Sequence, residues 1–502
     1  MKKQIFCIAL VGLMLLALLA GCSKGGDGTD TTPVGGDTSG GSTIIRPGTP
    51  GDSILGDPYE DYENDDLPED LDYGNEDFVI LCDSAQYGKS FADTDPGDTI
   101  NSAVYKRKSV VEDRLNIALN VKRQEGAYGG MDDFVRALEQ GGESYDLVLA
   151  YNLTPATMAV QGLICDMSDT AYLNFSKPWW SGSLLENVTI NGNVYFTGDN
   201  SSWNNLRNML AIFVDKELFR ANHPDMDINT LYDMVENNEW TMEAMFELIE
   251  GTYRDTATPG EVTGADTFGL SGGNEVWTEA WYFAAGFHVL NQNESGEWKF
   301  NIGTTESINF VDWFTGQFLD NEDVYRADDS QYKMFLDQRV QFYVSALSIV
   351  EQQPKQSFGE LPMPMYDPER QDGYKTHFSN TYDMYCIPSA LTAEERDRSS
   401  AVLECLASEA YRRIGPAYFE VYLKSRNASD DRLADMYDII RESIVFDIGV
   451  LFGELFVKGN NPVYYVRRVL NGYVDSLGAT WTQDVENQYL ELWSQNLEKL
   501  TD

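Results

Sequence analysis

The stretch from residue 78 to residue 121, FVILCDSAQYGKSFADTDPGDTINSAVYKRKSVVEDRLNIALNV, decides the fold class. Its two ends, FVILC and IALNV, are short apolar runs of the kind that form buried strands, and residues 99–115 between them have the spacing of an amphipathic helix. A strand, a helix and a second strand in this order are typical of a βαβ unit with parallel strands. A helical pattern at 132–141 and a strand-like run at 145–151 continue the alternation. We therefore predict an α/β fold.

The carboxyl ends of these strands are the first candidate for a binding site. In open parallel sheets, the ligand crevice lies beyond the carboxyl ends of the strands. Asp83 and Tyr87 follow the first strand, and Tyr151 and Asn152 end and follow the third. We expect these side chains to contact a ligand, with turn or helix-cap duty as the alternative for the Asp and the Asn.

The N-terminus predicts export and a lipid anchor. Lys2 and Lys3 precede an apolar run over residues 5–20, which is the layout of a secretory signal and is shorter than the roughly 20 residues that a spanning helix needs. Residues 19–22, LAGC, resemble the bacterial lipobox, in which the cysteine becomes the lipid-bearing N-terminus. We expect a signal peptide over 1–22 and a lipid on Cys22, which would hold the protein at the outer face of the cytoplasmic membrane. An ordinary secreted protein cleaved near residue 20 is the alternative.

The chain is strongly acidic, and its acids are dense in one segment. It has 81 Asp and Glu against 36 Lys and Arg, a formal net charge of −45. Such a surface repels nucleic acid and anionic lipid, so we expect neither as a partner of the folded part. Residues 23–77 are rich in Gly, Ser, Thr and Pro and then in acids, with too few apolar residues to fold, and we predict a disordered acidic tether there.

Cysteine use indicates no metal site. Four cysteines follow the N-terminal region, and none has the C-x-x-C spacing of a zinc site. Cys82, Cys165 and Cys386 lie in apolar runs, where a free thiol behaves as a small core residue. We therefore interpret these three cysteines as structural, and we expect no cofactor.

Five segments resemble extracellular solute-binding proteins of family 1, the carbohydrate-uptake type. They are YDLVLAYNLTPATMAVQGLICDMSD (145–169), NNLRNMLAIFVDKELF (204–219), NNEWTMEAMFELIE (237–250), FLDQRVQFYVSALSIVE (335–351) and FGELPMPMYDPERQDGYKTHFSNTYDMYCIP (358–388). The resemblance rests on their order and spacing, which extend over nearly all of residues 78–502.

This resemblance implies a type II periplasmic-binding-protein-like fold, with two discontinuous α/β lobes around a ligand cleft. The implied ranges are 78–200 and 380–440 for lobe 1, 201–379 and 441–502 for lobe 2, and 195–211 and 375–387 for the crossing segments. The helical pattern at 476–501 would pack on lobe 2. Contacts made by both lobes exist only in the closed form, so a ligand would shift the equilibrium towards closure.

Further candidate ligand residues come from the loops that the resemblance places at the cleft. A sugar site needs flat aromatic rings for stacking and carboxylates or amides for paired hydrogen bonds. Those loops and crossings contain the aromatic residues Trp203, Trp277, Trp281 and Tyr382 and the acids Asp199 and Asp383. The alternative for each aromatic residue is a place in the core.

A lipid-anchored serine hydrolase is one alternative function. Residues 269–273, GLSGG, match the G-x-S-x-G nucleophile elbow, with Ser271 as the nucleophile. The base would have to be His288 or His377, the histidines that follow it, and neither lies in a sequence context that indicates a catalytic base. The simpler interpretation is a glycine-rich loop that leads into a helix.

Three other patterns are weaker. Residues 225–236 place acids at calcium-loop positions, but Thr230 replaces the glycine that the turn needs, and Asn229 as the N-cap of a helix explains the same residues. Paired carboxylates suited to glycoside hydrolysis could occur anywhere among so many acids. A helical-repeat glycan-binding lipoprotein would need a 34-residue period, which this sequence lacks.

The sequence therefore predicts a substrate-binding lipoprotein of an ABC importer, not an enzyme. It would capture an extracellular oligosaccharide as a monomer and deliver it to the permease subunits. Binding of a solute other than a sugar stays open, because related folds take peptides, polyamines or phosphoesters.

Overall fold

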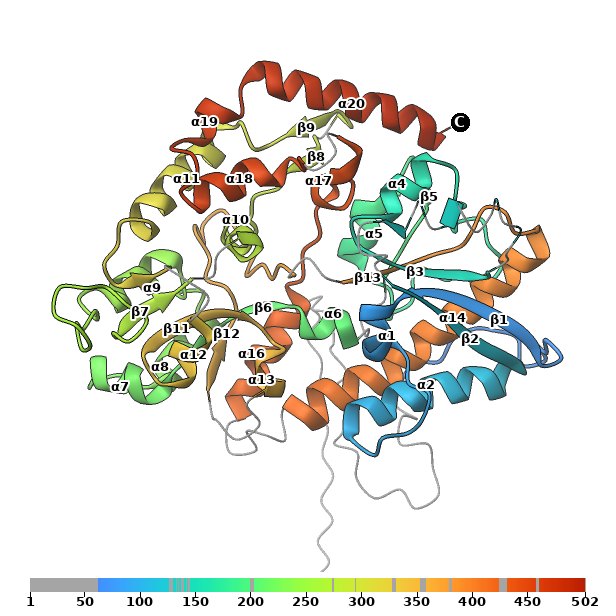
Figure 1. Cartoon of the computed structure of the whole chain (residues 1–502), viewed down its shortest axis with the longest axis horizontal. Helices are drawn as coiled ribbons and strands as arrows, with labels where there is room; N and C mark the ends of the chain where they lie inside the picture. Colours follow the sequence, from blue (N-terminus) through green and yellow to red (C-terminus); the bar gives the residue numbers. More distant parts are fainter. Residues whose placement is uncertain are drawn as a thin grey trace, which may run out of the picture. The chain divides into compact units, whose positions relative to one another are not determined.

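Two larger β-sheets organise the chain in a computed structural model (Figure 1), and two further sheets have two strands each. The described residues are 62–125, 130–131, 133, 135–136, 140, 142, 145–198, 203–272, 275–293, 295–326, 331–352, 358–378, 382–423, 431–456 and 460–501, and all of them fall in one compact unit. The predicted signal peptide, Cys22, most of the predicted tether and Asp199 lie outside these residues.

The first sheet has the strand order β13-β3-β1-β2. Its strands are β1 (Glu76–Asp83), β2 (Ile117–Gln124), β3 (Leu147–Tyr151) and β13 (Asp383–Cys386). β1 is parallel to β2 and β3, whereas β13, which comes from far along the chain, is antiparallel to β3. The predicted βαβ unit is thus confirmed.

The crossover helix α2 (Thr99–Leu115) has local start and stop signals. The Asp98 side chain accepts a hydrogen bond from the Asn101 N–H at the start of α2, and Asn116 ends the helix in the left-handed region, with φ of 46°. Asn tolerates this conformation better than most residues. The turn that follows leads directly into β2.

The second sheet has the order β10-β7-β11-β6-β12 and mixed strand directions. Its strands are β6 (Leu210–Val214), β7 (Phe268–Ser271), β10 (Val324–Tyr325), β11 (Val340–Ala346) and β12 (Gly359–Leu361). Every residue of β6 and β11 is buried, which is typical of strands covered on both faces. We name the part built on the first sheet lobe 1 and the part built on the second lobe 2.

The remaining elements surround these sheets. They are α1 (Ser84–Ser90), α4 (Pro155–Val160), α5 (Gly182–Val188), β4 (Thr189–Ile190), β5 (Asn193–Val194), α6 (Trp203–Arg207), α7 (Lys216–Asn222), α8 (Ile228–Glu236), α9 (Met242–Ile249), the short helix η1 (Glu275–Thr278), α10 (Glu279–Ala284), β8 (Leu290–Gln292), β9 (Trp298–Phe300), α11 (Thr305–Phe318), α12 (Gln331–Leu336), α13 (Ile349–Gln352), α14 (Ala393–Pro416), the π-helical η2 (Ala417–Leu423), α16 (Asp431–Glu442), α17 (Ile448–Leu451), the short helix η3 (Gly453–Leu455), α18 (Val463–Leu470), α19 (Leu477–Thr480) and α20 (Gln483–Thr501).

The first two crossings, near 195–211 and 375–387, lie side by side with the segment 443–447, which joins α16 to α17. An antiparallel bridge pairs Met209 of the first crossing with Phe378 of the second, and a parallel bridge pairs Thr376 with Ile444 of this segment. The Leu210 N–H donates to the His377 carbonyl at 2.9 Å. The first two crossings fall where the family resemblance implied them.

The acidic segment at 62–77 differs from the predicted tether, because it packs on lobe 1. Leu67 is only 6% exposed. Asp65 forms an ion pair with Arg114 of α2 at 2.6 Å, and Lys177 pairs with both Glu63 and Asp66. These acids find basic partners that are distant in the sequence, which a reading of local composition cannot detect.

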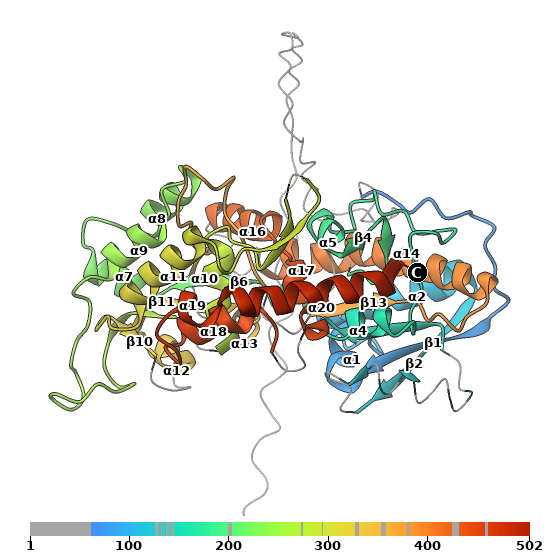
Figure 2. The same ribbon diagram turned by 90° about the horizontal axis from the view of Figure 1, so that it is seen from above.

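The C-terminal region also differs from the implied lobe boundaries. α14 packs on α2 of lobe 1, but α16 packs on β12 and α8, so the chain has returned to lobe 2 before residue 431 rather than after 440. α20 contacts β9 of lobe 2 (Figure 1) and also α4 of lobe 1 (Figure 2). The last helix therefore contacts both lobes rather than lobe 2 alone.

Candidate functional site

Five of the predicted ligand residues meet at the carboxyl edge of the first sheet. Asp383 lies opposite Tyr151 in the antiparallel register of β13 and β3. The Asn152 N–H donates to the Tyr382 carbonyl at 3.1 Å. Asp83 ends β1 and is buried, and β1 is the other neighbour of β3. The second crossing thus brings two predicted residues, Tyr382 and Asp383, to a strand edge that lies more than 200 residues earlier in the chain.

Asp383 is held by two residues that the sequence analysis missed. The Ser90 hydroxyl, at the end of α1, donates to Asp383 Oδ2 at 3.0 Å. The Asn205 side chain of α6 bonds to the backbone of Asp383, accepting from its N–H at 3.0 Å and donating to its carbonyl at 3.5 Å. Their separations in sequence from Asp383, 293 and 178 residues, leave no local signal for either contact.

Several buried polar atoms at this edge have no hydrogen-bond partner among the described residues. They are both side-chain atoms of the Asn152 amide, which lies near the Tyr382 hydroxyl without a hydrogen bond of good geometry, and the hydroxyls of Thr154 and Thr197. Asn152 and Thr197 have no exposed surface, and Thr154 is buried. Leaving a buried donor or acceptor unpaired costs about 1–3 kcal/mol, so native structures rarely gather such atoms without a functional reason. A ligand rich in hydroxyl groups could satisfy them.

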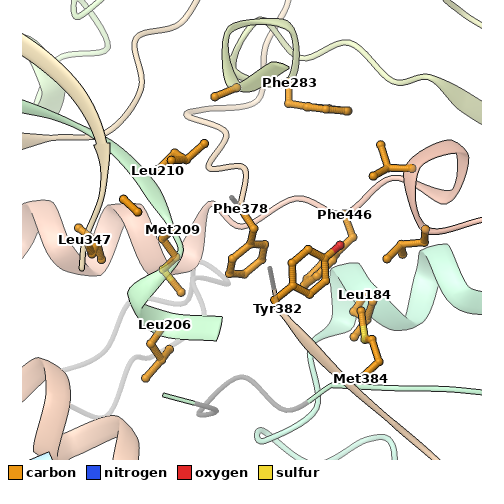
Figure 3. Packing of buried hydrophobic residues seen from close by; sticks show 14 of the residues in the cluster. Leu184, Leu206, Met209, Leu210, Phe283, Leu347, Phe378, Tyr382, Met384 and Phe446 are labelled. Atoms are coloured by element: carbon orange, nitrogen blue, oxygen red, sulfur yellow. The ribbon is translucent and has the colours of Figure 1, made fainter. Parts of the chain in front are cut away.

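Aromatic rings pack together along the crossings (Figure 3). The Tyr382 ring lies 5.1 Å from that of Phe378 and 5.8 Å from that of Phe446, measured between centroids. Burial raises the pKa of the Tyr382 hydroxyl, which therefore stays protonated at neutral pH and can donate a hydrogen bond.

A small cavity opens next to this aromatic group. Its lining is mainly apolar, with Asn205 and Ser181 as its polar side chains, and the remaining lining residues are Leu184, Gly198, Met209, Phe378, Met384, Ile444 and Phe446. Its free volume of about 10 Å³ is close to the minimum for one water molecule. A larger ligand at this place would require the surrounding elements, which belong to lobe 1, to the two crossings and to the segment 443–447, to separate.

Tyr87 lies in a different environment from the five residues at the strand edge. The Arg123 guanidinium lies 3.4 Å from the centroid of its ring, and the Phe91 ring stacks on it at 6.2 Å. Its hydroxyl donates to Asp93 Oδ1 at 2.5 Å. These neighbours leave little of the ring for a ligand.

The three predicted tryptophans are not brought together. Trp281 is fully buried, with its ring 5.1 Å from that of Phe314, so in this conformation it has no free face. Trp277, in η1, and Trp203, in α6, are half-buried. The Arg207 guanidinium lies 5.4 Å from the centroid of the Trp203 ring.

The environment of Ser271 gives no support to a nucleophile elbow. Ser271 is fully buried in β7, and its hydroxyl donates to Gln331 Oε1 at 2.8 Å, an amide oxygen that cannot act as a general base. His288 bonds to Asp447. His377 stacks on the Phe283 ring at 4.2 Å, and burial lowers its pKa to about 3.

The acids of the calcium-like segment have other roles. Asp227, not Asn229 as predicted, caps α8, and it forms a capping box with Thr230. Two further acids of the segment, Asp233 and Glu236, form ion pairs with Arg432. Over the described part of the chain, no cluster of three or more His, Cys, Asp or Glu side chains is placed to hold a metal ion.

Two other sequence expectations concern thiols and membrane spans. Cys82, Cys165 and Cys386 are buried and free, which confirms that they are core residues, and Cys405 is buried and free as well. Burial raises the pKa of each thiol. No helix within the described ranges combines the length and the apolar character that crossing a membrane would require.

Comparisons with known proteins identify the fold. Neither a protein-family model nor a curated protein matches the sequence. A solved structure of a cyclic α-maltosyl-1,6-maltose binding protein from Arthrobacter globiformis is similar, with 12% identity and a TM-score of 0.53 over 85% of this chain and 100% of that one. The galacto-N-biose-/lacto-N-biose I-binding protein of the ABC transporter from Bifidobacterium longum has 11% identity and a TM-score of 0.53 over 86% of this chain and 98% of that one. A cyclo/maltodextrin-binding protein complexed with maltotetraose has 13% identity and a TM-score of 0.52 over 84% of this chain and 97% of that one. The chain thus has the two-lobed α/β fold of periplasmic sugar-binding proteins.

Proposed function

We propose that this protein is the substrate-binding lipoprotein of an ABC importer and captures an extracellular oligosaccharide by lobe closure. The observation that carries the proposal is the group of buried, unpartnered polar atoms of Asn152, Thr154 and Thr197 at the carboxyl edge of the first sheet. They lie at the end of lobe 1 where the crossings meet it, which is where ligands bind in open α/β sheets.

The chemistry of the site suits a sugar. Sugar hydroxyl groups can both donate and accept, so they can pair with an amide, with hydroxyl groups and with the carboxylates of Asp83 and Asp383. The rings of Tyr382, Phe378 and Phe446 offer apolar surface for the CH faces of a sugar ring. The half-buried Trp203 and Trp277, and Asp199, remain proposed contacts for further sugar units.

Fold and sequence support the other parts of the proposal. The three similar structures are binding proteins, one of them belongs to an ABC transporter, and the ligands in their names are oligosaccharides. For this chain we infer a lipid on Cys22, a place on the outer face of the cytoplasmic membrane, and transfer of the ligand to permease subunits. Replacing Cys22 with Ser should release the protein from the membrane fraction into the medium.

Thermal shift of the full chain tests the ligand class. The probes are maltotetraose, lacto-N-biose I and a cyclic maltosyl-maltose, each at 1 mM as a trial concentration. A ligand present at about 100 times its Kd stabilises the folded state by about 2.7 kcal/mol. We expect a rise in melting temperature with at least one sugar, which is then recovered chemically unchanged. Hydrolysis products that disappear in Ser271→Ala would overturn the proposal in favour of a hydrolase.

Variants of the site test its location. Asn152→Ala should weaken the binding of the responding sugar by about tenfold or more, because it removes both of the buried amide's hydrogen-bonding groups. Trp281→Phe, a change in a fully enclosed ring, is the matched control and should leave affinity within about twofold. Equal affinity of wild type and Asn152→Ala would remove this assignment of the site, and a response only to peptides or polyamines would replace the sugar by another solute.

A further inference from the structure

Arg107 of α2 is a buried cation with few polar contacts to offset the loss of water around its charge. Its side chain is 1% exposed, and its Nη2 donates to the backbone carbonyl of Ser90. The Phe91 ring centroid lies 5.5 Å from its guanidinium carbon. Within the described part of the chain it has no carboxylate partner, and its Nε has no acceptor. Burying a guanidinium in this way is costly, and such a residue is rarely kept without a role.

The contact with Ser90 links Arg107 to the candidate site. Ser90 is the last residue of α1, and its carbonyl is among those that the helix itself leaves unpaired. A cation is favourable there, since the C-terminal end of a helix carries partial negative charge. By holding this carbonyl, Arg107 fixes the position of the residue whose hydroxyl donates to Asp383 Oδ2.

Asp383 is therefore restrained through two separate elements. Asn205 holds its backbone, and Ser90 holds its carboxylate. A carboxylate that must accept hydrogen bonds from a ligand gains affinity from being held in place before the ligand arrives, because less freedom is lost on binding. The buried Arg107 contacts Ser90, and Ser90 in turn contacts the Asp383 carboxylate.

We propose that Arg107 is a positioning residue of the ligand site, acting through Ser90 on the carboxylate of Asp383 without touching the ligand. This inference rests on the proposed function for its effect on affinity. It also predicts a change in the ligand-free protein, namely a looser C-terminal turn of α1.

The matched pair of variants is Arg107→Met and Arg114→Met. Both lie on α2, two turns apart, but Arg114 pairs with Asp65 and makes no contact with α1. In the full chain, Arg107→Met should weaken binding of maltotetraose, or of lacto-N-biose I if the wild type binds that sugar instead, by about tenfold. Arg114→Met should stay within about twofold of wild type, whatever its effect on melting temperature.

A rescue and a double-mutant cycle separate positioning from general stability. Arg107→Lys can still donate to the Ser90 carbonyl and should recover most of the affinity. Ser90→Ala should lose about as much affinity as Arg107→Met, and the double variant should lose little more than either one, because both changes break the same link. Ser90→Ala removes a single hydroxyl and keeps the test available if Arg107→Met fails to fold.

Hydrogen exchange provides a readout that needs no ligand. Amides of residues 84–91 should exchange several times faster in Arg107→Met than in wild type, while those of β7 in lobe 2 stay unchanged. If wild type binds neither sugar, the proposed function fails but this readout still tests the link. Unchanged exchange at 84–91, additive losses in the cycle, or an equal loss in Arg114→Met would each overturn the role of Arg107.

Discussion

The Nδ1 of His288 lies 3.3 Å from Oδ2 of Asp447, and this contact joins the turn before β8 to the start of α17. The same carboxylate caps α17 through the Gly449 N–H and accepts the Val289 N–H, both at 2.8 Å. Hydrogen bonding to Asp447 raises the pKa of His288 above its usual value of 6.5. The antiparallel hairpin of β8 and β9 and the segment 443–447 are thus joined through the His288 side chain.

This pair predicts a pH dependence of stability. Because the folded pKa is raised, the stabilisation is fully present below the unfolded pKa of about 6.5 and is lost as pH rises through the folded value. We expect the melting temperature of wild type to fall over that window by more than that of His288→Gln, in scans from pH 5 to pH 9. An equal fall of the melting temperature in wild type and in His288→Gln would contradict the role of this contact.

Glu404 predicts a second pH effect, on the side of lobe 1. Its carboxylate accepts from the Trp180 indole N–H at 3.1 Å and from the Asn174 N–H at 3.2 Å, and burial raises its pKa to about 7. Stability from this group is present below the unfolded pKa of about 4.5 and is lost as pH rises through 7. Glu404→Gln should therefore be more stable than wild type at pH 8, by roughly 2 kcal/mol, and show no such gain at pH 4.5. Urea unfolding at the two pH values measures this, and an equal effect at both would contradict it.

The docked acidic segment predicts that residues before β1 contribute to folding stability. Leu67→Ala should lower the free energy of unfolding by about 2–3 kcal/mol, since a buried leucine is truncated. Asp70→Ala, an exposed neighbour, should change it by less than about 0.5 kcal/mol. If this segment were a free tether, the two variants would be indistinguishable in denaturant titrations.

The end of α20 predicts a contact between the lobes that can be weakened on its own. The Tyr195 hydroxyl of the first crossing donates to the Leu500 carbonyl at 2.5 Å, and Leu500 is 2% exposed. Tyr195→Phe should cost about 1 kcal/mol and speed hydrogen exchange at residues 497–501. Residues 485–493, which pack on lobe 2 through Trp493 against Trp298, should keep their protection. Faster exchange over the whole of α20 would show that the helix does not contact the two lobes independently.

Much of the fold and part of the site could be predicted from local patterns. The apolar runs at 78–82 and 117–121 with a helix between them predict parallel strands, because side-chain periodicity and burial act over a few residues. Asp83, Tyr151 and Asn152 follow from the same reasoning, since the end of a strand is a local property and ligands bind there. Tyr382 and Asp383 needed the family resemblance, because nothing near them in sequence shows that their segment crosses to lobe 1.

Only the tertiary structure decided the remaining contacts. Ser90 and Asn205 hold Asp383 across separations of 293 and 178 residues, and Asp65 holds Arg114 across 49, so no window of sequence contains both partners. The enclosure of Trp281 and the docking of an acidic segment were likewise missed, because an aromatic ring or a carboxylate has the same local sequence whether it meets solvent or a partner. Local interactions fix where strands and helices form, whereas burial and charge pairing depend on which of these elements the chain brings together.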